Sequence, residues 1–325
     1  MVLRAVLGVL LIAGLFGPAD SFGAPTVHRS PDAAPRCIGL TPPTSHSTAG
    51  RRPSSAGRRA ARIPSAEERR LQMATSSASE SSSTSEGKRE RAPQLIFPGG
   101  GIFFYWQAGA VTHLRESGYD LSSVSMSGAS AGALTATLAA TGVDFLDATD
   151  LALQFAQEAG VWDRPLGLQG VWGSLIERWL DDLLPPDAHA TANDGPGLQL
   201  LVTPVPSFGK TKVTDFRDRS DLIRANMASI HIPWFLDGKL TTRYRDAEHI
   251  DGSFLSKATD YVTEVRPKNV VRLDWTKDPA MSDKKLGDFV EALSKEGIWD
   301  LVERGKSYAA LMEERGDFES LPRLS

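Results

Sequence analysis

The feature that most constrains this chain is a turn at Gly128, Ser130 and Gly132, which has the pattern G-x-S-x-G. An apolar run precedes the turn and the alanine-rich residues 133–140 follow it, which predicts a strand, a tight reversal and a helix. Small residues suit such a turn because the reversal packs the backbone of the central serine against its neighbours. Ser130 is therefore a candidate nucleophile. The alternative is a small-residue turn that only packs a helix on a sheet.

A second glycine turn lies upstream, at Gly99, Gly100 and Gly101, between the apolar residues 94–97 and another predicted helix. Glycine amides carry no Cβ atom beside them, so they can point at the negative oxygen that forms when a serine attacks a carbonyl group. The helix that follows Ser130 also starts with unpaired amides, which favour negative charge. Together the two turns favour the catalytic interpretation over the packing one.

The first 94 residues have the composition of targeting segments. Residues 1–16 are almost wholly apolar and too few for a comfortable membrane span, which predicts a signal peptide over residues 1–22. Residues 23–65 are rich in Arg, Ser, Pro and Ala with a single acid, Asp32, and residues 76–85 are serine-rich. We therefore expect a transit peptide and a disordered linker over residues 23–94. With Phe22 at the junction, the order resembles the bipartite presequence of proteins sent to plastids bounded by extra membranes; the alternative is a secreted or endomembrane protein.

Charge and cysteine usage differ between the two parts of the chain. The first 94 residues hold 13 Lys and Arg against 7 Asp and Glu, and the remainder holds 23 against 33, a net charge of −10. Such a domain should repel nucleic acid. The one cysteine, Cys37, lies in the first part, so no disulfide or thiolate metal site is expected in the domain. No metal-binding or complete cofactor motif is present, and neither a metal nor a cofactor is expected.

Residues 95–325 predict a single α/β domain with a mostly parallel central sheet and helices on both faces, because apolar strands alternate with helical patterns. Helices are expected near residues 102–117, after Asp144, and over 166–184, 220–229, 286–293 and 299–314. Residues 189–197 are expected to form a polar loop, and a hairpin is expected to end near residue 251. Reactive groups in such sheets gather at the carboxyl ends of strands, where both glycine turns lie.

Ser130 needs a base, because a serine hydroxyl is a poor nucleophile. Four of the six histidines, His113, His189, His231 and His249, lie beyond residue 94, and none stands in a motif. Asp251 is better placed, since it ends a predicted strand and precedes a glycine that permits close approach. An ordinary Asp-Gly turn is the alternative, and periodicity alone leaves both interpretations open.

Three motifs in order, Phe97-Pro-Gly-Gly-Gly101, Gly128-Ala-Ser-Ala-Gly132 and Asp251-Gly-Ser253, resemble those of the patatin-like phospholipase family. The resemblance implies a lipid acyl hydrolase with a Ser-Asp pair and no histidine. It implies Ser130 as nucleophile, Asp251 as base, and an oxyanion hole formed by the amides of Gly99, Gly100, Gly101 and Ala131. The implied substrate is a glycerolipid, reached at a membrane or lipid-droplet surface.

The chain departs from the family pattern in two places. Phe103 and Phe104 stand where the oxyanion loop often continues with a basic residue and a glycine, and Ser253 replaces the commoner glycine or alanine after Asp-Gly. The altered loop motivates one alternative, a catalytically silent lipid-binding member of the family.

Another alternative is an α/β-hydrolase esterase with a triad of Ser130, an acid such as Asp215 or Asp218, and His249. Gly209-Lys-Thr211 resembles the end of a phosphate-binding loop, but the glycine required five residues earlier is absent, so this motif is set aside. Arg243 and Arg245 are candidates to meet a charged head group. The tryptophans at 162, 172, 179 and 234 are candidates for lipid contact, with buried packing as the stronger expectation.

Overall fold

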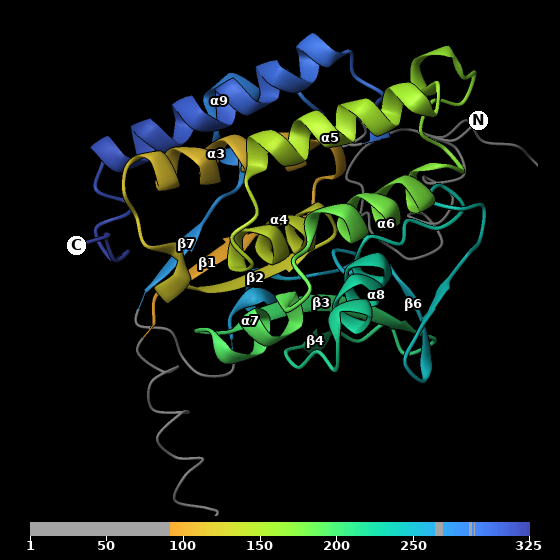
Figure 1. Cartoon of the computed structure of the whole chain (residues 1–325), viewed down its shortest axis with the longest axis horizontal. Coiled ribbons are helices and arrows are strands. Elements are labelled where there is room, and N and C mark those ends of the chain that lie inside the picture. The colour runs from red at the N-terminus through yellow and green to blue at the C-terminus, as the bar shows by residue number, and fades with distance from the viewer. Residues whose placement is uncertain (1–91, 264–268, 286–287, 289) are drawn as a thin grey trace, which may run out of the picture.

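The computed structural model describes residues 92–263, 269–285, 288 and 290–325 (Figure 1). Within them, seven strands form one mixed sheet in the order β5-β6-β3-β2-β1-β7, with β4 paired to β3. The strands are β1 (Gln94–Phe97), β2 (Ser125–Ala129), β3 (Leu198–Val205), β4 (Thr211–Val213), β5 (Thr242–Tyr244), β6 (Ala247–Ile250) and β7 (Val270–Arg272). The α-helices are α3 (Phe104–Glu116), α4 (Ala131–Ala140), α5 (Phe145–Glu158), α6 (Trp172–Leu183), α7 (Ala188–Asp194), α8 (Arg219–Ser229) and α9 (Lys295–Glu314). The α/β class is confirmed.

The parallel part of the sheet is formed by β7, β1, β2 and β3, and the antiparallel strands β4, β5 and β6 extend it beyond β3. The register of β1 and β2 pairs Phe97 with Gly128, so the two neighbouring strands end at nearly the same level. As expected, both glycine turns therefore start at one edge of the sheet.

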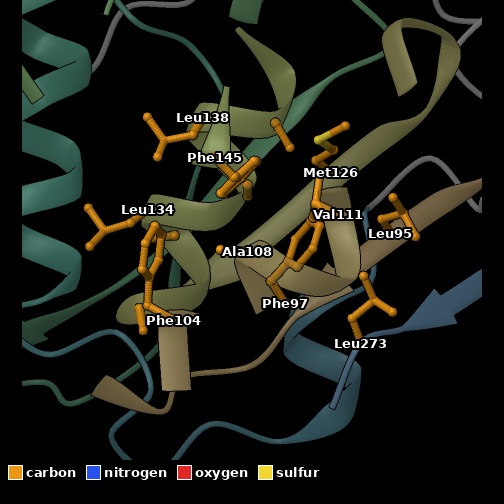
Figure 2. Packing of buried hydrophobic residues seen from close by; sticks show 14 of the residues in the cluster. Leu95, Phe97, Phe104, Ala108, Val111, Met126, Leu134, Leu138, Phe145 and Leu273 are labelled. Carbon is orange, nitrogen blue, oxygen red and sulfur yellow. The ribbon is translucent and has the colours of Figure 1, made fainter. Parts of the chain in front are cut away.

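Alternation along the strands divides the apolar side chains between two faces. Leu95, Phe97 and Met126 belong to a large cluster that also contains residues of the α-helices, and Figure 2 shows part of it. On the opposite face, a small cluster packs Ile96 with Tyr261 of the short 3-10 helix η4 (Ala258–Tyr261). Among the described residues, the α-helices pack in the large cluster on the first face, whereas the apolar cover of the second face comes from η4 and Val262 after it.

Helix α9 packs along α3, as Figure 1 shows. Two glycines make the close approach possible. A Cβ atom at Gly109 of α3 would lie 1.9 Å from the Val302 carbonyl oxygen, and one at Gly305 of α9 would lie 1.8 Å from the Trp106 carbonyl oxygen. The two helix backbones are therefore in direct contact, next to the point where the first glycine turn enters α3.

Two of the secondary-structure predictions were wrong. The predicted loop over 189–197 contains α7, because Ala188 and Ala192 lie four residues apart and are both buried on one face. The helix expected over 166–184 begins only at Trp172, since Gly167 and Gly170 have positive φ angles of 51° and 80°.

Other expectations had different outcomes. The helix after Asp144 is confirmed, with that carboxylate capping α5, and so is the hairpin that leads to residue 251. Residues 286, 287 and 289 of the expected helix 286–293 lie outside the described residues. The predicted targeting segments over 1–91 also lie outside them.

Candidate functional site

Ser130 occupies the sharp reversal between β2 and α4, with φ 55° and ψ −130°. This region is unfavourable for a residue with a side chain, and such strain is typical of functional turns. Gly132 is required because a Cβ atom there would lie 1.9 Å from the Phe97 carbonyl oxygen, and Gly128 because its Cβ atom would lie 1.9 Å from the Gly132 carbonyl oxygen. The Ser130 amide donates to the Ser229 hydroxyl at 3.0 Å, which helps to hold the strained turn.

Asp251 follows β6 and lies at the same edge of the sheet. The register pairs Ala129, the last residue of β2, with Leu201, and Ile250, the last residue of β6, with Thr203. The two strand ends therefore approach each other over neighbouring residues of β3. The Asp251 amide donates to the His231 carbonyl at 2.8 Å, and the Thr203 hydroxyl donates to the Asp251 carbonyl at 2.9 Å.

The Asp251 carboxylate is 7% exposed, and its two oxygens have different surroundings. Oδ1 accepts hydrogen bonds from the Ser253 amide at 2.8 Å and the Ser253 hydroxyl at 2.6 Å. Oδ2 has no well-formed hydrogen bond within the described residues. Burial raises the pKa of Asp251, while the nearby Ser130 hydroxyl, the hydrogen bonds from Ser253 and the charge of Lys210 act in the opposite direction. The Ser130 hydroxyl is thus close enough to act on this carboxylate.

The glycine turn completes the site. A Cβ atom at Gly99 would lie 2.6 Å from the Ser253 Cβ atom and 3.2 Å from the Ser130 Cβ atom, so this backbone touches both partner turns. Burial raises the pKa of Tyr261, and the contact with the Ser256 hydroxyl and the charge of Arg272 oppose the rise.

Four amides are available at this edge of the sheet. Within the described residues, the amides of Gly99, Gly100, Gly101 and Ala131 donate no hydrogen bond to another group of the protein. Gly101, with φ 54°, starts a short 3-10 turn that leads into α3, and Ala131 starts α4. Unpaired amides at helix starts are partial positive charges, so this corner suits an anionic oxygen.

An apolar cavity opens beside Ser130, with about 950 Å³ of empty space that includes part of its open mouth. The polar end is formed by Ser130, Ala131 and Gly101. Its walls are apolar side chains of α3, α4, α5 and α6 together with Ile232, Leu236 and Leu293. In the aromatic run after the glycine turn, Phe104 is buried in the core and also lines the cavity.

The structure does not assemble the alternative triad. The His249 ring contacts the Ala247 carbonyl oxygen at 3.0 Å and the Tyr244 ring, and Asp218 caps α8. His113 pairs with Glu313 at 2.8 Å. Among the described residues, no histidine is recorded in a hydrogen bond with Ser130 or with the Asp251 carboxylate.

The remaining candidates divide clearly. Arg245 forms an ion pair with the buried Asp221 at 2.7 Å, so it holds the fold together and does not project as a free head-group ligand. Trp172 and Trp179 line the cavity, whereas Trp234 is 41% exposed. The expectation of burial therefore fails at Trp234.

Sequence reasoning missed several residues around Asp251. Thr203 and Tyr261 come from β3 and η4, where no local pattern marks them, and Lys210 was noted only in the Gly209-Lys-Thr211 motif that was set aside. Ser229 had a signal, because it stands in the approach to the hairpin that ends at Asp251.

Comparison with known proteins identifies the family. The family model described as patatin-like phospholipase matches residues 95–259, about half of the chain. The chain belongs to the patatin-like phospholipase family. The match covers all three motifs, and α9 lies beyond it.

Two curated relatives illustrate the similarity. The mouse omega-hydroxyceramide transacylase is 28% identical over 176 residues, which are 53% of this chain and 28% of that protein. The human patatin-like phospholipase domain-containing protein 2 is 30% identical over 167 residues, 50% of this chain and 32% of that protein. The chain thus matches about a third of the length of these patatin-like relatives.

A solved structure is also similar in part. VipD from Legionella pneumophila covers 56% of this chain, and the match covers 50% of VipD, with a TM-score of 0.34 and 13% identity. This likeness adds nothing to the family assignment.

Proposed function

We propose that this protein cleaves carboxylic ester bonds of glycerolipids through Ser130 and Asp251. The observation that carries the proposal is the meeting of a strained serine, a buried carboxylate and unpaired amides at the polar end of an apolar cavity. Each of these features is costly for stability on its own. Their occurrence together at one sheet edge favours chemistry over packing.

The reaction has two halves. Ser130 Oγ attacks the ester carbonyl carbon while Asp251 Oδ2 accepts the hydroxyl proton; the tetrahedral intermediate then expels the alcohol, which takes that proton, and leaves an acyl-enzyme. Water attacks the acyl-enzyme in the same way, giving the free fatty acid and Ser130. The low exposure of Asp251 supports its role as a base, because desolvation increases the proton affinity of a carboxylate.

The oxyanion hole is formed by the glycine turn and the start of α4. The amides of Gly99, Gly100, Gly101 and Ala131 supply the donors, and the Gly99 backbone also brings the loop into contact with Ser130. Loss of one such donor costs roughly 2.7–4 kcal/mol of transition-state stabilisation in a comparable hydrolase site.

The cavity favours a long acyl chain in the substrate. A wall of apolar side chains that begins beside the nucleophile binds a hydrocarbon chain by burying it, and gives no specific partner to a polar group. The head group of the glycerolipid would then remain outside, near the exposed surface.

Two loops at the cavity, residues 164–171 and 231–241, form the surface that we propose meets lipid; we call them the rim loops. Ile232 and Leu236 line the cavity while Trp234 on the same loop is exposed. The Gly170 amide donates to the Phe235 carbonyl at 2.8 Å, which joins the two loops. Leu166 and Leu240 add further exposed apolar surface. Among the described residues, no helix is long and apolar enough to cross a bilayer.

The test is to incubate the protein and its Ser130→Ala and Asp251→Asn variants with mixed glycerolipid vesicles and to quantify fatty acids and lysolipids. We expect release by the wild type and at least a hundredfold loss in both variants. The variant His249→Ala should stay active; if it fails together with Ser130→Ala while Asp251→Asn stays active, the triad replaces the Ser-Asp pair.

A fluorophosphonate probe and an added long-chain alcohol complete the test. Labelling of the wild type but not of Ser130→Ala supports an active serine, and failure to label either points to a silent lipid-binding protein. Transfer of the acyl group to the alcohol in place of water would instead support a transacylase, the activity named for the mouse relative.

A further inference from the structure

Lys210 lies in the turn between β3 and β4, and its side chain extends toward the turn at Asp251. Its ammonium group donates to the Thr203 hydroxyl at 2.7 Å and to the Phe254 carbonyl oxygen. The Thr203 hydroxyl in turn donates to the Asp251 carbonyl at 2.9 Å. One side chain therefore connects β3 with Asp251, through Thr203, and with the residue that follows the Asp-Gly-Ser motif.

The charge of Lys210 is held in partly buried surroundings. Burial lowers the pKa of Lys210 to about 8, and the carboxylates of Asp251 and Asp260 oppose this by favouring the charged form. The reciprocal effect is that Lys210 favours the ionised form of Asp251. The other titratable groups whose charges act on or respond to Asp251 are His231 and Tyr261.

An attachment role alone does not require a cation here. Surface lysines usually keep the ammonium group in water, because its desolvation is costly. Burial removes part of the hydration of the Lys210 ammonium group. It also disfavours the ionised form of the Asp251 carboxylate, on which the charge of Lys210 acts. A nearby positive charge is what such a carboxylate needs in order to lose its proton and act as a base.

We propose that Lys210 is a positioning residue of the Ser130–Asp251 pair, which fixes the Asp251 turn and keeps the Asp251 carboxylate ionised at the pH at which it must accept the Ser130 proton. This inference rests on the function proposed above. It gives the residue of the discarded Gly209-Lys-Thr211 motif a role that involves no phosphate.

The experiment measures kcat/KM against pH with a soluble short-chain ester, for the wild type, Lys210→Met, Lys210→Arg and Lys212→Met. We expect the acid limb of Lys210→Met to move to higher pH by roughly 1 unit, the size typical of losing one nearby opposite charge. Lys210→Arg keeps the charge and should keep the limb in place. Lys212→Met is the matched control, because Lys212 is two residues away and its ammonium group donates to the Val262 carbonyl at 2.8 Å.

Several outcomes would overturn the inference. A Lys210→Met variant whose rate falls equally at every pH shows a structural role only, and a shift shared by Lys212→Met shows a general charge effect. If Lys210→Met does not fold, Lys210→Gln, which keeps N–H donors without the charge, carries the same test. Wild-type protein no more active than Ser130→Ala would reject the proposed function and this inference together, whereas Ser130-dependent activity with an unmoved limb rejects this inference alone.

Discussion

At the scale of single residues, Gly99 is where the three turns of the site touch. Its α-carbon leaves no room for a methyl group, since the added atom would lie 2.6 Å from the Ser253 Cβ atom. We predict that Gly99→Ala lowers kcat/KM about a hundredfold, because a displacement near 1 Å at a reacting centre costs about that much. The measurement is ester hydrolysis with the melting temperature followed in parallel.

The pair Gly99→Ala and Ser253→Gly tests the cause of that loss. Removing the Ser253 side chain removes the 2.6 Å contact and leaves only the milder 3.2 Å contact with Ser130. The double variant should therefore be more active than Gly99→Ala alone. Equal activity of the single and double variants would show that the glycine is needed for another reason, such as its amide.

The buried Asp251 makes stability depend on pH. Its pKa is raised in the folded protein, chiefly by burial, so the ionised form favours unfolding. The penalty is absent below the unfolded pKa, grows as pH rises toward the folded pKa, and is complete above it. We predict that Asp251→Asn melts at a higher temperature than the wild type at pH 7 and at the same temperature near pH 3.

Thermal melts of both proteins across this range are the measurement. A variant that melts lower than the wild type at pH 7 would show that the hydrogen bonds from Ser253 outweigh the desolvation of the charge. Ser253→Ala serves as a control, because it removes one of those donors and leaves the carboxylate in place.

The catalytic candidates were predictable because each stands in a motif with a steric cause. A Cβ atom would lie only 1.9 Å from a backbone oxygen at Gly128, Gly132 and Gly252, so these positions require glycine and the motifs are visible in the sequence. Lys210 and Tyr261 were not predictable. Each acts across tertiary contacts, and a lysine in a turn or a tyrosine in a short helix is an ordinary surface pattern.

At the scale of elements, the rim loops are the segments whose side chains divide between the cavity and solvent. We predict that Trp234→Ser weakens binding to zwitterionic vesicles roughly tenfold, because an exposed indole gains free energy on entering the lipid interface. Hydrolysis of a soluble short ester should be unchanged. Vesicle flotation and ester hydrolysis measure the two effects.

Leu311→Ser is the matched control for this change. Leu311 is 43% exposed, close to the 41% of Trp234, but it lies on α9 and does not line the cavity. Equal loss of binding in both variants would mean that general surface hydrophobicity, and not the rim loops, governs association with lipid.

Element prediction succeeded where a local signal specified the boundary. Asp144 accepts hydrogen bonds from the amides of Leu146 and Asp147, so the start of α5 followed from its cap. The antiparallel strands at the edge are short, three or four residues, and their pairing with β3 depends on long-range contacts. A local pattern does not specify such contacts. The sequence therefore predicted a mostly parallel sheet, whereas the structure has a mixed one.

At the scale of the whole molecule, the acidic domain follows a basic segment of different composition. We predict that residues 1–94, fused to a fluorescent protein, carry it into a plastid bounded by extra membranes, since a predicted signal peptide and an arginine-rich, acid-poor stretch occur in that order. Phe22→Ala should stop the reporter at an earlier membrane. Secretion of the unaltered fusion would support the endomembrane alternative.

The close contact of α3 with α9 has a consequence for how the protein can be shortened or recombined. The first glycine turn leads directly into α3. Helix α9 packs against α3 through close contacts at Gly109 of α3 and Gly305 of α9, and α9 lies beyond residue 259, outside the segment that matches the family. A fragment that ends with the shared segment would keep every motif yet lose the support behind the first glycine turn. The shortest fragment that preserves the site must therefore include α9, and it is longer than the segment 95–259 by which the family is identified.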